Sequence, residues 1–251
     1  NGRIIDGNQE ELSWTRDVLV TYFQVTREHP TIKEAHRIFL ETEKEKEFDT
    51  RKPERGRGDK RIPYRRDLDE VPVSYDELRK LAFKRRSVRW FSDEKVSRES
   101  IDKALSIALE APSACNRQPY EFRVYDDPEL VEEISDLPGG TTGYAENIPV
   151  LVVIIGRLRA YFDERDRHVI YVDASLAAMN FMLALETLGL SSCPINWPDV
   201  EHRERAMEEV LSLEPDERPV MLLAVGYPDP EGLVAYSEKK ELSRIRSYNK
   251  Q

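Results

Sequence analysis

The sequence predicts a mixed α/β sandwich in the second part of the chain, and three apolar segments carry this prediction. Residues 150–155 and 220–225 are continuous apolar runs, which is typical of strands covered on both faces. Between them, residues 171–188 are apolar nearly all the way round, which predicts a helix buried either in the core or in a subunit interface. Strands and helices that alternate in this way favour a layered fold.

A helical and charged extension, residues 1–73, precedes this domain. Apolar positions in residues 1–40 recur at helical spacing, with a break at Pro30. Residues 41–70 then change from acidic to basic and are interrupted by glycine and proline, so they cannot bury much apolar surface. We interpret them as a solvated linker; an arm that lies over a partner subunit and an Arg-Gly arm that binds nucleic acid are the alternatives.

The main domain, residues 74–251, begins with two capped helices. Ser74 and Glu77 have the spacing of a capping box, which opens a helix to about residue 84. Ser97 opens a second helix, whose apolar positions follow a helical period until Pro112 ends it. The remaining elements are expected as a strand at 121–125, helices at 129–134 and 201–211, and a glycine cap at Gly189 after the apolar helix.

Composition argues against several classes of function. The formal net charge is -10, from 48 acidic and 38 basic residues, so a general nucleic-acid binder is not expected. The four histidines and two cysteines lack the spacing of a metal site. Because no uninterrupted apolar run reaches the roughly 18–20 residues of a membrane helix, we expect no membrane span. The low cysteine count favours the cytoplasm.

Two short polar motifs carry the chemistry. In the first, Arg85, Arg86 and Arg89 surround Ser87, and guanidinium groups grip phosphate oxygens through paired hydrogen bonds. In the second, residues 112–119, Ser, Asn and Gln side chains lie between two prolines and offer donors and acceptors. Taken singly, the motifs are also compatible with a charged helix end and an ordinary polar loop. Together they suit a ligand that is anionic at one end and rich in hydroxyls and carbonyls at the other, and flavin mononucleotide (FMN) fits that description.

In this order, Arg-Arg-Ser-x-Arg-x-Phe at 85–91 and Ala-Pro-Ser-x-x-Asn-x-Gln-Pro at 111–119 resemble the FMN-dependent nitroreductase family. Residues 189–195 resemble the family segment that leads into the loop facing the flavin, and residues 223–228 resemble its last core strand. The resemblance covers roughly residues 74–240. It implies an α+β fold, a three-layer α/β/α sandwich with a central mixed sheet, in an intertwined homodimer whose core is the apolar helix.

The resemblance also implies roles for individual residues. Arg85 and either Lys239 or Lys240 would bind the FMN phosphate, and Arg89 would approach the pyrimidine side of the ring. The other implied cofactor-binding residues are Arg86, Ser87, Pro112, Ser113, Ala114, Asn116, Gln118, Pro194, Ile195 and Asn196. No side chain is expected to be catalytic and no metal is expected, because the flavin carries the chemistry.

The activity implied by the resemblance is FMN-dependent reduction of an organic acceptor, a nitro compound, a quinone or a dedicated metabolite. NADH or NADPH would donate the hydride in a ping-pong cycle. The alternatives are other flavin chemistry on the same fold (dehydrogenation, reductive dehalogenation or flavin fragmentation) and a flavin-free interaction protein. Asn196-Trp197 departs from the family pattern, and Trp197 is expected to cover or narrow the flavin site. Cys115 and Cys193 fall inside the flavin-facing motifs and are expected to be small buried fillers, with a redox role as the alternative.

Overall fold

A computed structural model of the chain describes residues 9–45, 61–65, 68 and 71–250. The chain forms two compact units, Asn1–Pro72 and Val73–Gln251. Most of the expected charged linker lies outside the described residues, so its interpretation stays a prediction.

The first unit contains two helices, α1 (Gln9–Val25) and α2 (Pro30–Glu45), which confirms the predicted break at Pro30. The helices are joined by stacked rings, because the Phe23 ring lies 4.4 Å from the His36 ring between centroids. Arg16 and Glu43 add an ion pair of 2.7 Å between Nε and Oε1.

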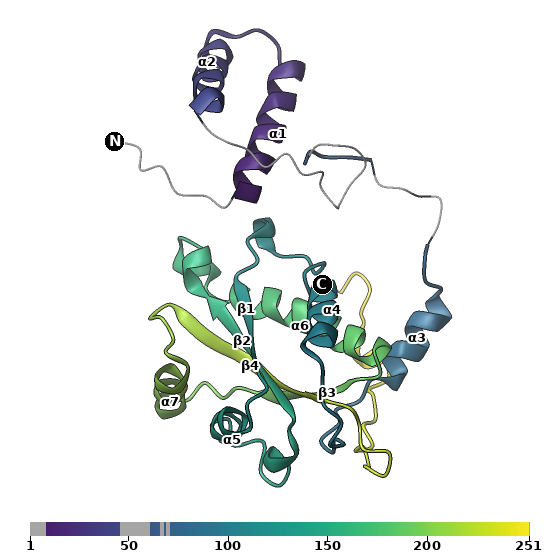
Figure 1. The fold of residues 1–251 in the computed structure, drawn as a ribbon. Helices are drawn as coiled ribbons and strands as arrows, with labels where there is room; N and C mark the ends of the chain where they lie inside the picture. Colours follow the sequence, from purple (N-terminus) through teal and green to yellow (C-terminus); the bar gives the residue numbers. More distant parts are fainter. Residues whose placement is uncertain (1–8, 46–60, 66–67, 69–70, 251) are drawn as a thin grey trace. The chain divides into compact units, whose positions relative to one another are not determined.

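The second unit is built on a four-stranded sheet with the order β1-β2-β4-β3 (Figure 1). These strands are β1 (Tyr120–Tyr125), β2 (Val150–Arg157), β3 (Ser191–Asn196) and β4 (Glu217–Gly226). All three neighbouring pairs are antiparallel. Ser87 adds an isolated parallel bridge to Ser192 of β3, which lies outside the four strands, so the sheet itself is antiparallel rather than mixed as expected.

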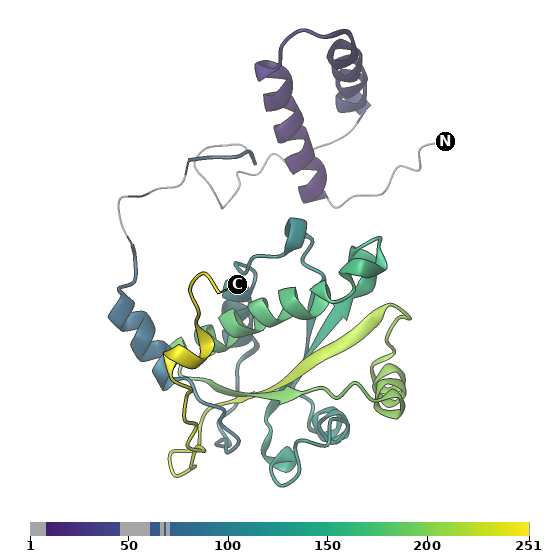
Figure 2. The same cartoon turned by 180° about the vertical axis from the view of Figure 1, so that it is seen from behind.

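Helices cover both faces of this sheet, as Figures 1 and 2 show. On one face lie α4 (Arg98–Ala108) and α6 (Val169–Thr187), and on the other lie α5 (Pro128–Asp136) and α7 (Glu201–Leu211). Strand β2 supplies both cores, because its alternate residues point to opposite faces: Val152 packs into the first core and Val153 into the second, both fully buried. The predicted three-layer α/β/α sandwich is therefore confirmed.

Local capping signals place the helix ends as the sequence predicted. The helix α3 (Tyr75–Lys84) begins with a complete capping box between Ser74 and Glu77. Ser97 accepts a hydrogen bond from the backbone of Ser100 at the start of α4. After α6, Gly189 has a φ of +78°, a conformation that glycine adopts without a steric penalty.

Strand β3 was not predicted, and its position in the sheet explains why. It is an edge strand, and the segment contains Pro194 and two serines, which have weak strand propensity. Proline lacks a backbone N–H and is tolerated at sheet edges. Pairing with β4 through six residues, from Ser191 to Asn196, forms the strand in spite of its sequence.

Helix α6 is buried on only one side within this chain. The face toward the sheet includes Ala174, Ala177 and Phe181, all with no exposed surface. On the other side Val172 and Leu176 expose 50% and 43% of their surface. The expectation of a helix buried all round is therefore wrong for a single chain, and the subunit-interface alternative stays a prediction.

The segment Glu164–Thr187, which contains α6, is long and apolar enough to cross a membrane by length and composition alone. Half of its most apolar window is buried inside the fold. Core helices of soluble proteins meet the same criterion, so this segment is weak evidence for a membrane span.

Candidate cofactor-binding site

The basic motif lies on an extended segment that is fixed to the edge of the sheet. The backbone N–H of Val88 donates to the carbonyl of Ser192 at 3.1 Å, and Phe91 forms an antiparallel bridge with Pro228 after β4. The side-chain amide of Asn147 clamps Phe91 through both of its backbone groups, at 2.6 and 3.1 Å. Because Val88 and Phe91 are buried, the intervening Arg89 points outward and is exposed.

The guanidinium groups of this motif are available to an anion. Among the residues that the structure describes, no carboxylate lies within ion-pair distance of Arg85 or Arg89. The nearest buried acid on α6 is Glu186, 5% exposed, which accepts a hydrogen bond from Ser191 Oγ at 3.3 Å. Burial raises the pKa of Glu186, while the nearby charges of Lys84 and Arg85 oppose that rise.

Tyr144 is a neighbour of this motif that sequence reasoning missed. The Arg89 guanidinium lies 5.7 Å from the centre of the Tyr144 ring. Burial, followed by the adjacent Cys193 thiol, raises the pKa of Tyr144 to about 12. Tyr144 belongs to the connection between α5 and β2, and only the tertiary fold brings it to Arg89.

Ser192 provides a test of whether a ligand fits here. It is fully buried, it pairs with Ser87 through the parallel bridge, and its hydroxyl has no hydrogen-bond partner. Buried polar groups in proteins are nearly always satisfied. An unsatisfied hydroxyl beside unpaired guanidinium groups is therefore consistent with a site for a polar, anionic group.

The second motif forms a strained turn between α4 and β1. It includes a short 3-10 helix, η1 (Ala114–Asn116). Cys115, Asn116 and Gln118 have φ values of 53°, 54° and 47°. Left-handed conformations cost a non-glycine residue roughly 1–2 kcal/mol each, and such strain persists only where surrounding contacts enforce it.

Internal hydrogen bonds hold the turn in this shape. Ser113 Oγ accepts from the backbone N–H of Gln118 at 3.0 Å, and the Gln118 amide donates to Asn116 Oδ1 at 3.0 Å. Cys115 is exposed at the tip, so the expectation that it is a buried filler is wrong. The same expectation is confirmed for Cys193, which is 1% exposed.

A buried carboxylate on α6 fixes the turn to the core. Asp173, 3% exposed, accepts hydrogen bonds at Oδ2 from the backbone N–H of Ala114 and from the hydroxyl of Tyr161, both at 3.0 Å. On the outer side, Arg117 donates to the carbonyl of Ala160 at 2.7 Å and lies over the Tyr161 ring. Sequence reasoning missed Asp173, although an acid in an otherwise apolar helix signals a buried partner.

The two motifs are not brought together within one chain. Ser87 pairs with Ser192 of β3, Ser192 pairs with Val225 of β4, and Val225 pairs with Val150. Ser87 is therefore level with the first residue of β2. The strained turn precedes Tyr120 of β1, which pairs with Gly156 near the other end of β2. Four strand spacings, counted from Ser87 through β3, β4 and β2 to β1, and six residues of strand length give a separation on the order of 25–30 Å. Figures 1 and 2 show the α3–α4 and α4–β1 connections at opposite ends of the second unit.

The remaining predicted site residues lie on β3 and on the chain after β4. Pro194 and Asn196 are exposed, whereas the Ile195 side chain is 3% exposed and points into the core. Lys239 and Lys240 are exposed, and Lys239 Nζ donates to Ser237 Oγ at 2.9 Å.

Trp197 does not have the place that the sequence suggested. Its side chain is 8% exposed and packs in the core on the α5–α7 face. Its indole N–H donates to the carboxylate of Glu204 on α7. The expectation that Trp197 covers the site is therefore wrong, because the ring is fixed beneath the sheet.

The fold defines the class: a three-layer α+β protein, with unpaired guanidinium groups at the edge of its sheet. The model of the nitroreductase family matches residues 82–142 and 139–227, more than half of the chain. The chain belongs to the nitroreductase family and is an oxidoreductase. Among the described residues, no group of three or more His, Cys, Asp or Glu side chains could hold a metal ion.

Relatives within the family have different named activities. The chain is 32% identical over 157 residues to an Archaeoglobus fulgidus protein named for NADH dehydrogenase/NAD(P)H nitroreductase activity, covering 62% of this chain and 88% of that protein. It is 31% identical over 172 residues to an iodotyrosine deiodinase of Thermotoga neapolitana, covering 59% and 87%. Among solved structures, an FMN-dependent nitroreductase from Clostridium difficile superposes with a TM-score of 0.59 and 28% identity, covering 68% of this chain and 98% of that one.

Proposed function

We propose that this protein is an FMN-dependent oxidoreductase that uses NADH or NADPH to reduce a small organic acceptor, and that it acts as a homodimer. The observation that carries the proposal is the set of unpaired guanidinium groups beside the unsatisfied hydroxyl of Ser192. The names of the nitroreductase relatives, which include FMN and NAD(P)H, support the choice of cofactor and donor.

The basic segment would hold the polar end of the flavin. Arg85 suits the phosphate, because guanidinium forks bind phosphate oxygens in pairs and Arg85 has no carboxylate partner among the described residues. Lys239 or Lys240 would add a second cation to the phosphate. The hydroxyls of Ser87 and Ser192, the latter without a hydrogen-bond partner, offer neutral donors to the ribityl chain or ring edge.

Arg89 would lie at the pyrimidine edge of the ring. The flavin, when bound, supplies the hydride transfer itself. A fixed cation at that edge stabilises the negative charge that reduction leaves there. A cation–π contact with the Tyr144 ring would keep the Arg89 guanidinium in place without neutralising its charge.

A second copy of the chain would complete the site. The strained turn with Ser113 and Asn116 lies too far from Arg85 to serve the same flavin within one chain, as the sheet register requires. The apolar outer face of α6 and the helix α3, which has no buried residue, both lack a covering element in a single chain. Burying these faces against each other in a dimer removes apolar area from water and brings a turn to each basic segment.

The test is a visible absorption spectrum and an FMN titration of the purified full-length protein. We expect flavin bands near ~450 nm and a stoichiometry of one FMN per chain. Arg85→Ala should weaken FMN binding by roughly tenfold or more. The matched control is Arg205→Ala, which removes an exposed arginine paired with Glu201 on α7 and should not change the affinity. A colourless protein that takes up no FMN would contradict the proposal.

A second candidate reaction is reductive dehalogenation, which the similarity to an iodotyrosine deiodinase favours. Both reactions use the same cofactor site, so the acceptor decides between them. Steady-state assays with a nitroaromatic, a quinone and iodotyrosine would separate the candidates. Release of iodide in preference to reduction of the other two acceptors would replace the first candidate with the second.

A further inference from the structure

We propose that Asp173 is a positioning residue for the cofactor: from α6 it fixes the strained turn of residues 113–118 in the conformation that presents Ser113 and Asn116 to the flavin. The inference rests on the proposed function, since it assigns a means of holding one half of that site. Asp173 is not a ligand-binding residue, because it lies behind the turn and is 3% exposed.

The first argument is that a carboxylate in this place requires donors. Asp173 lies on an apolar helix among residues such as Ala174 and Ala177, which have no exposed surface. A buried charge without partners is strongly unfavourable. Its Oδ2 receives two donors, the Ala114 backbone N–H and the Tyr161 hydroxyl, each at 3.0 Å. One of these donors belongs to the turn, so the carboxylate couples the position of the turn to the core.

The second argument is where the contact enters the turn. Ala114 directly precedes Cys115 and Asn116, the first two residues with left-handed φ values. On the far side of the strained residues, the carbonyl of Pro119 accepts from the backbone N–H of Arg157 at 2.8 Å. The turn is thus held at both ends, and the left-handed residues between them have no freedom to relax while both contacts persist.

The third argument concerns the surroundings of Asp173. Burial, and then the hydrogen bond to Asp173, raises the pKa of Tyr161, so this phenol remains a donor. A second phenol, Tyr120, is buried without a hydrogen-bond partner, and burial followed by the charge of Asp173 raises its pKa also. The two phenols around the Asp173 carboxylate are therefore neutral, and the Arg117 guanidinium lies over the ring of one of them, Tyr161.

The experiment compares FMN with riboflavin, which differ only in the phosphate. Asp173→Ala should raise the dissociation constants of both ligands by the same factor, about tenfold or more, with the stoichiometry unchanged. Arg85→Ala should raise the constant for FMN alone. The dissociation constants of Asp173→Asn, which keeps an acceptor oxygen, should lie between those of Asp173→Ala and the native protein. Asp136→Asn, which removes an exposed acid on α5 across the sheet, is the matched control.

Ala114→Pro tests the same contact from the other side. Proline deletes the N–H that Asp173 accepts, and its ring suits the helical backbone at this position. Ser113, with φ −134° and ψ 152°, already has the extended conformation that a following proline demands. Ala114→Pro should raise the dissociation constants for FMN and riboflavin by the same factor as Asp173→Ala. The double variant should bind no more weakly than the weaker-binding single variant, because both substitutions remove the same interaction.

The outcomes separate the two proposals. If the native protein binds neither FMN nor riboflavin, the proposed function fails, and this inference fails with it. If the native protein binds both and Asp173→Ala leaves both constants unchanged, or weakens FMN alone, only the role of Asp173 is overturned. If Asp173→Ala lowers the number of FMN molecules bound per chain but leaves the dissociation constant unchanged, Asp173 serves folding rather than positioning. That result would also overturn the role proposed for Asp173.

Discussion

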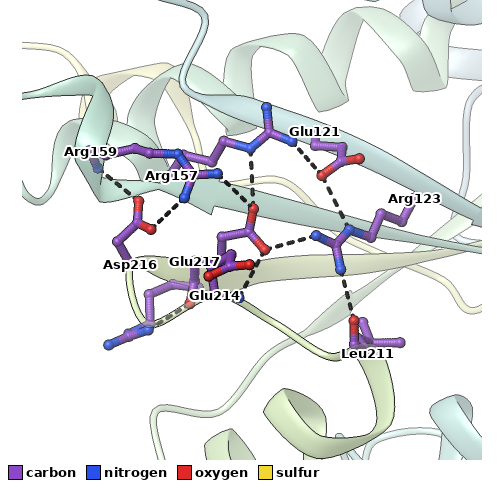
Figure 3. Close-up of polar contacts among 9 residues, drawn as sticks. Glu121, Arg123, Arg157, Arg159, Leu211, Glu214, Asp216 and Glu217 are labelled. Carbon is purple, nitrogen blue, oxygen red and sulfur yellow. Dashed lines mark hydrogen bonds and ion pairs between the residues drawn. The ribbon is translucent and has the colours of Figure 1, made fainter.

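Glu217 of β4 is hydrogen-bonded to Arg123 of β1, at 2.8 Å between Oε2 and Nη2, although β2 lies between these two strands. The Glu217 side chain is 3% exposed and also pairs with Arg157 and Arg159, at 3.3 and 3.1 Å (Figure 3). One buried carboxylate therefore links three guanidinium groups at one end of the sheet.

Glu217→Ala should lower the free energy of unfolding by about 1.5–3 kcal/mol, because it removes the charged hydrogen bonds that this buried carboxylate accepts. The cost stays below that of an isolated buried charge, because Arg123 and Arg157 keep Glu121 and Arg159 keeps Asp216. The measurement is urea unfolding at neutral pH. As a control, Glu201→Ala removes an exposed helical partner of Arg205 and should change the free energy by less than about 1 kcal/mol. Similar losses in the two variants would show that the network does not stabilise the fold.

The same carboxylate predicts a loss of stability in acid. Burial alone would raise the pKa of Glu217, but the Glu214 backbone N–H and the charges of Arg123 and Arg157 outweigh it, and the pKa lies below the ordinary 4.5. The unfolded chain therefore binds this proton first as the pH falls, so the contribution is present above 4.5 and is lost as the pH falls through the lower folded value. As the pH falls from 4.5 through the folded pKa, the free energy of unfolding of Glu217→Gln should decline less than that of the native protein. An identical decline would contradict the assignment.

Gly226→Ala should destabilise the protein at the end of β4. An added Cβ would lie 2.6 Å from Pro149 Cγ and 2.7 Å from Phe91 Cδ1, both in packed surroundings. Overpacking of this kind costs about 1–3 kcal/mol, and displacement of Phe91 should also weaken FMN binding. Gly140→Ala is the control, since no heavy atom lies within 4 Å of its added Cβ. Thermal unfolding and FMN titration of both variants check the difference.

Trp197→Phe should affect stability rather than access to the flavin. Loss of the indole N–H leaves the Glu204 carboxylate without that donor, at a cost of about 1–3 kcal/mol. The dissociation constant for FMN and the KM for a bulky acceptor should stay at their native values, because the ring packs in the core. A large fall in KM with unchanged stability would instead place Trp197 over the site.

The parts of the fold that the sequence predicted depend on local signals. The capping box at Ser74, the cap at Ser97 and the glycine after α6 act within a few residues of themselves, and each is confirmed. The apolar run of β2 was recognisable because burial on both faces leaves no polar position in it.

The parts that the sequence did not predict depend on tertiary contacts. Strand β3 forms only because β4 pairs with it, and its own residues do not favour a strand. Tyr144 and Asp173 join the candidate site through neighbours about 50 residues or more away, Cys193 and Ala114, and no spacing in the sequence connects them. The family motifs predicted Ser113 and Asn116 as site residues, but they gave no sign of Asp173, the acid that fixes their turn to the core.

The placement of the two motifs at opposite corners of one sheet has a genetic consequence. In the proposed dimer, each site takes Arg85 from one copy and Asn116 from the other. Chains with Arg85→Ala and chains with Asn116→Ala would each be defective alone, yet a mixed dimer would contain one site in which both residues are native. Refolding the two together should restore about a quarter of the native sites. Two inactive alleles would then complement each other, and the unit on which selection acts would be the pair of chains.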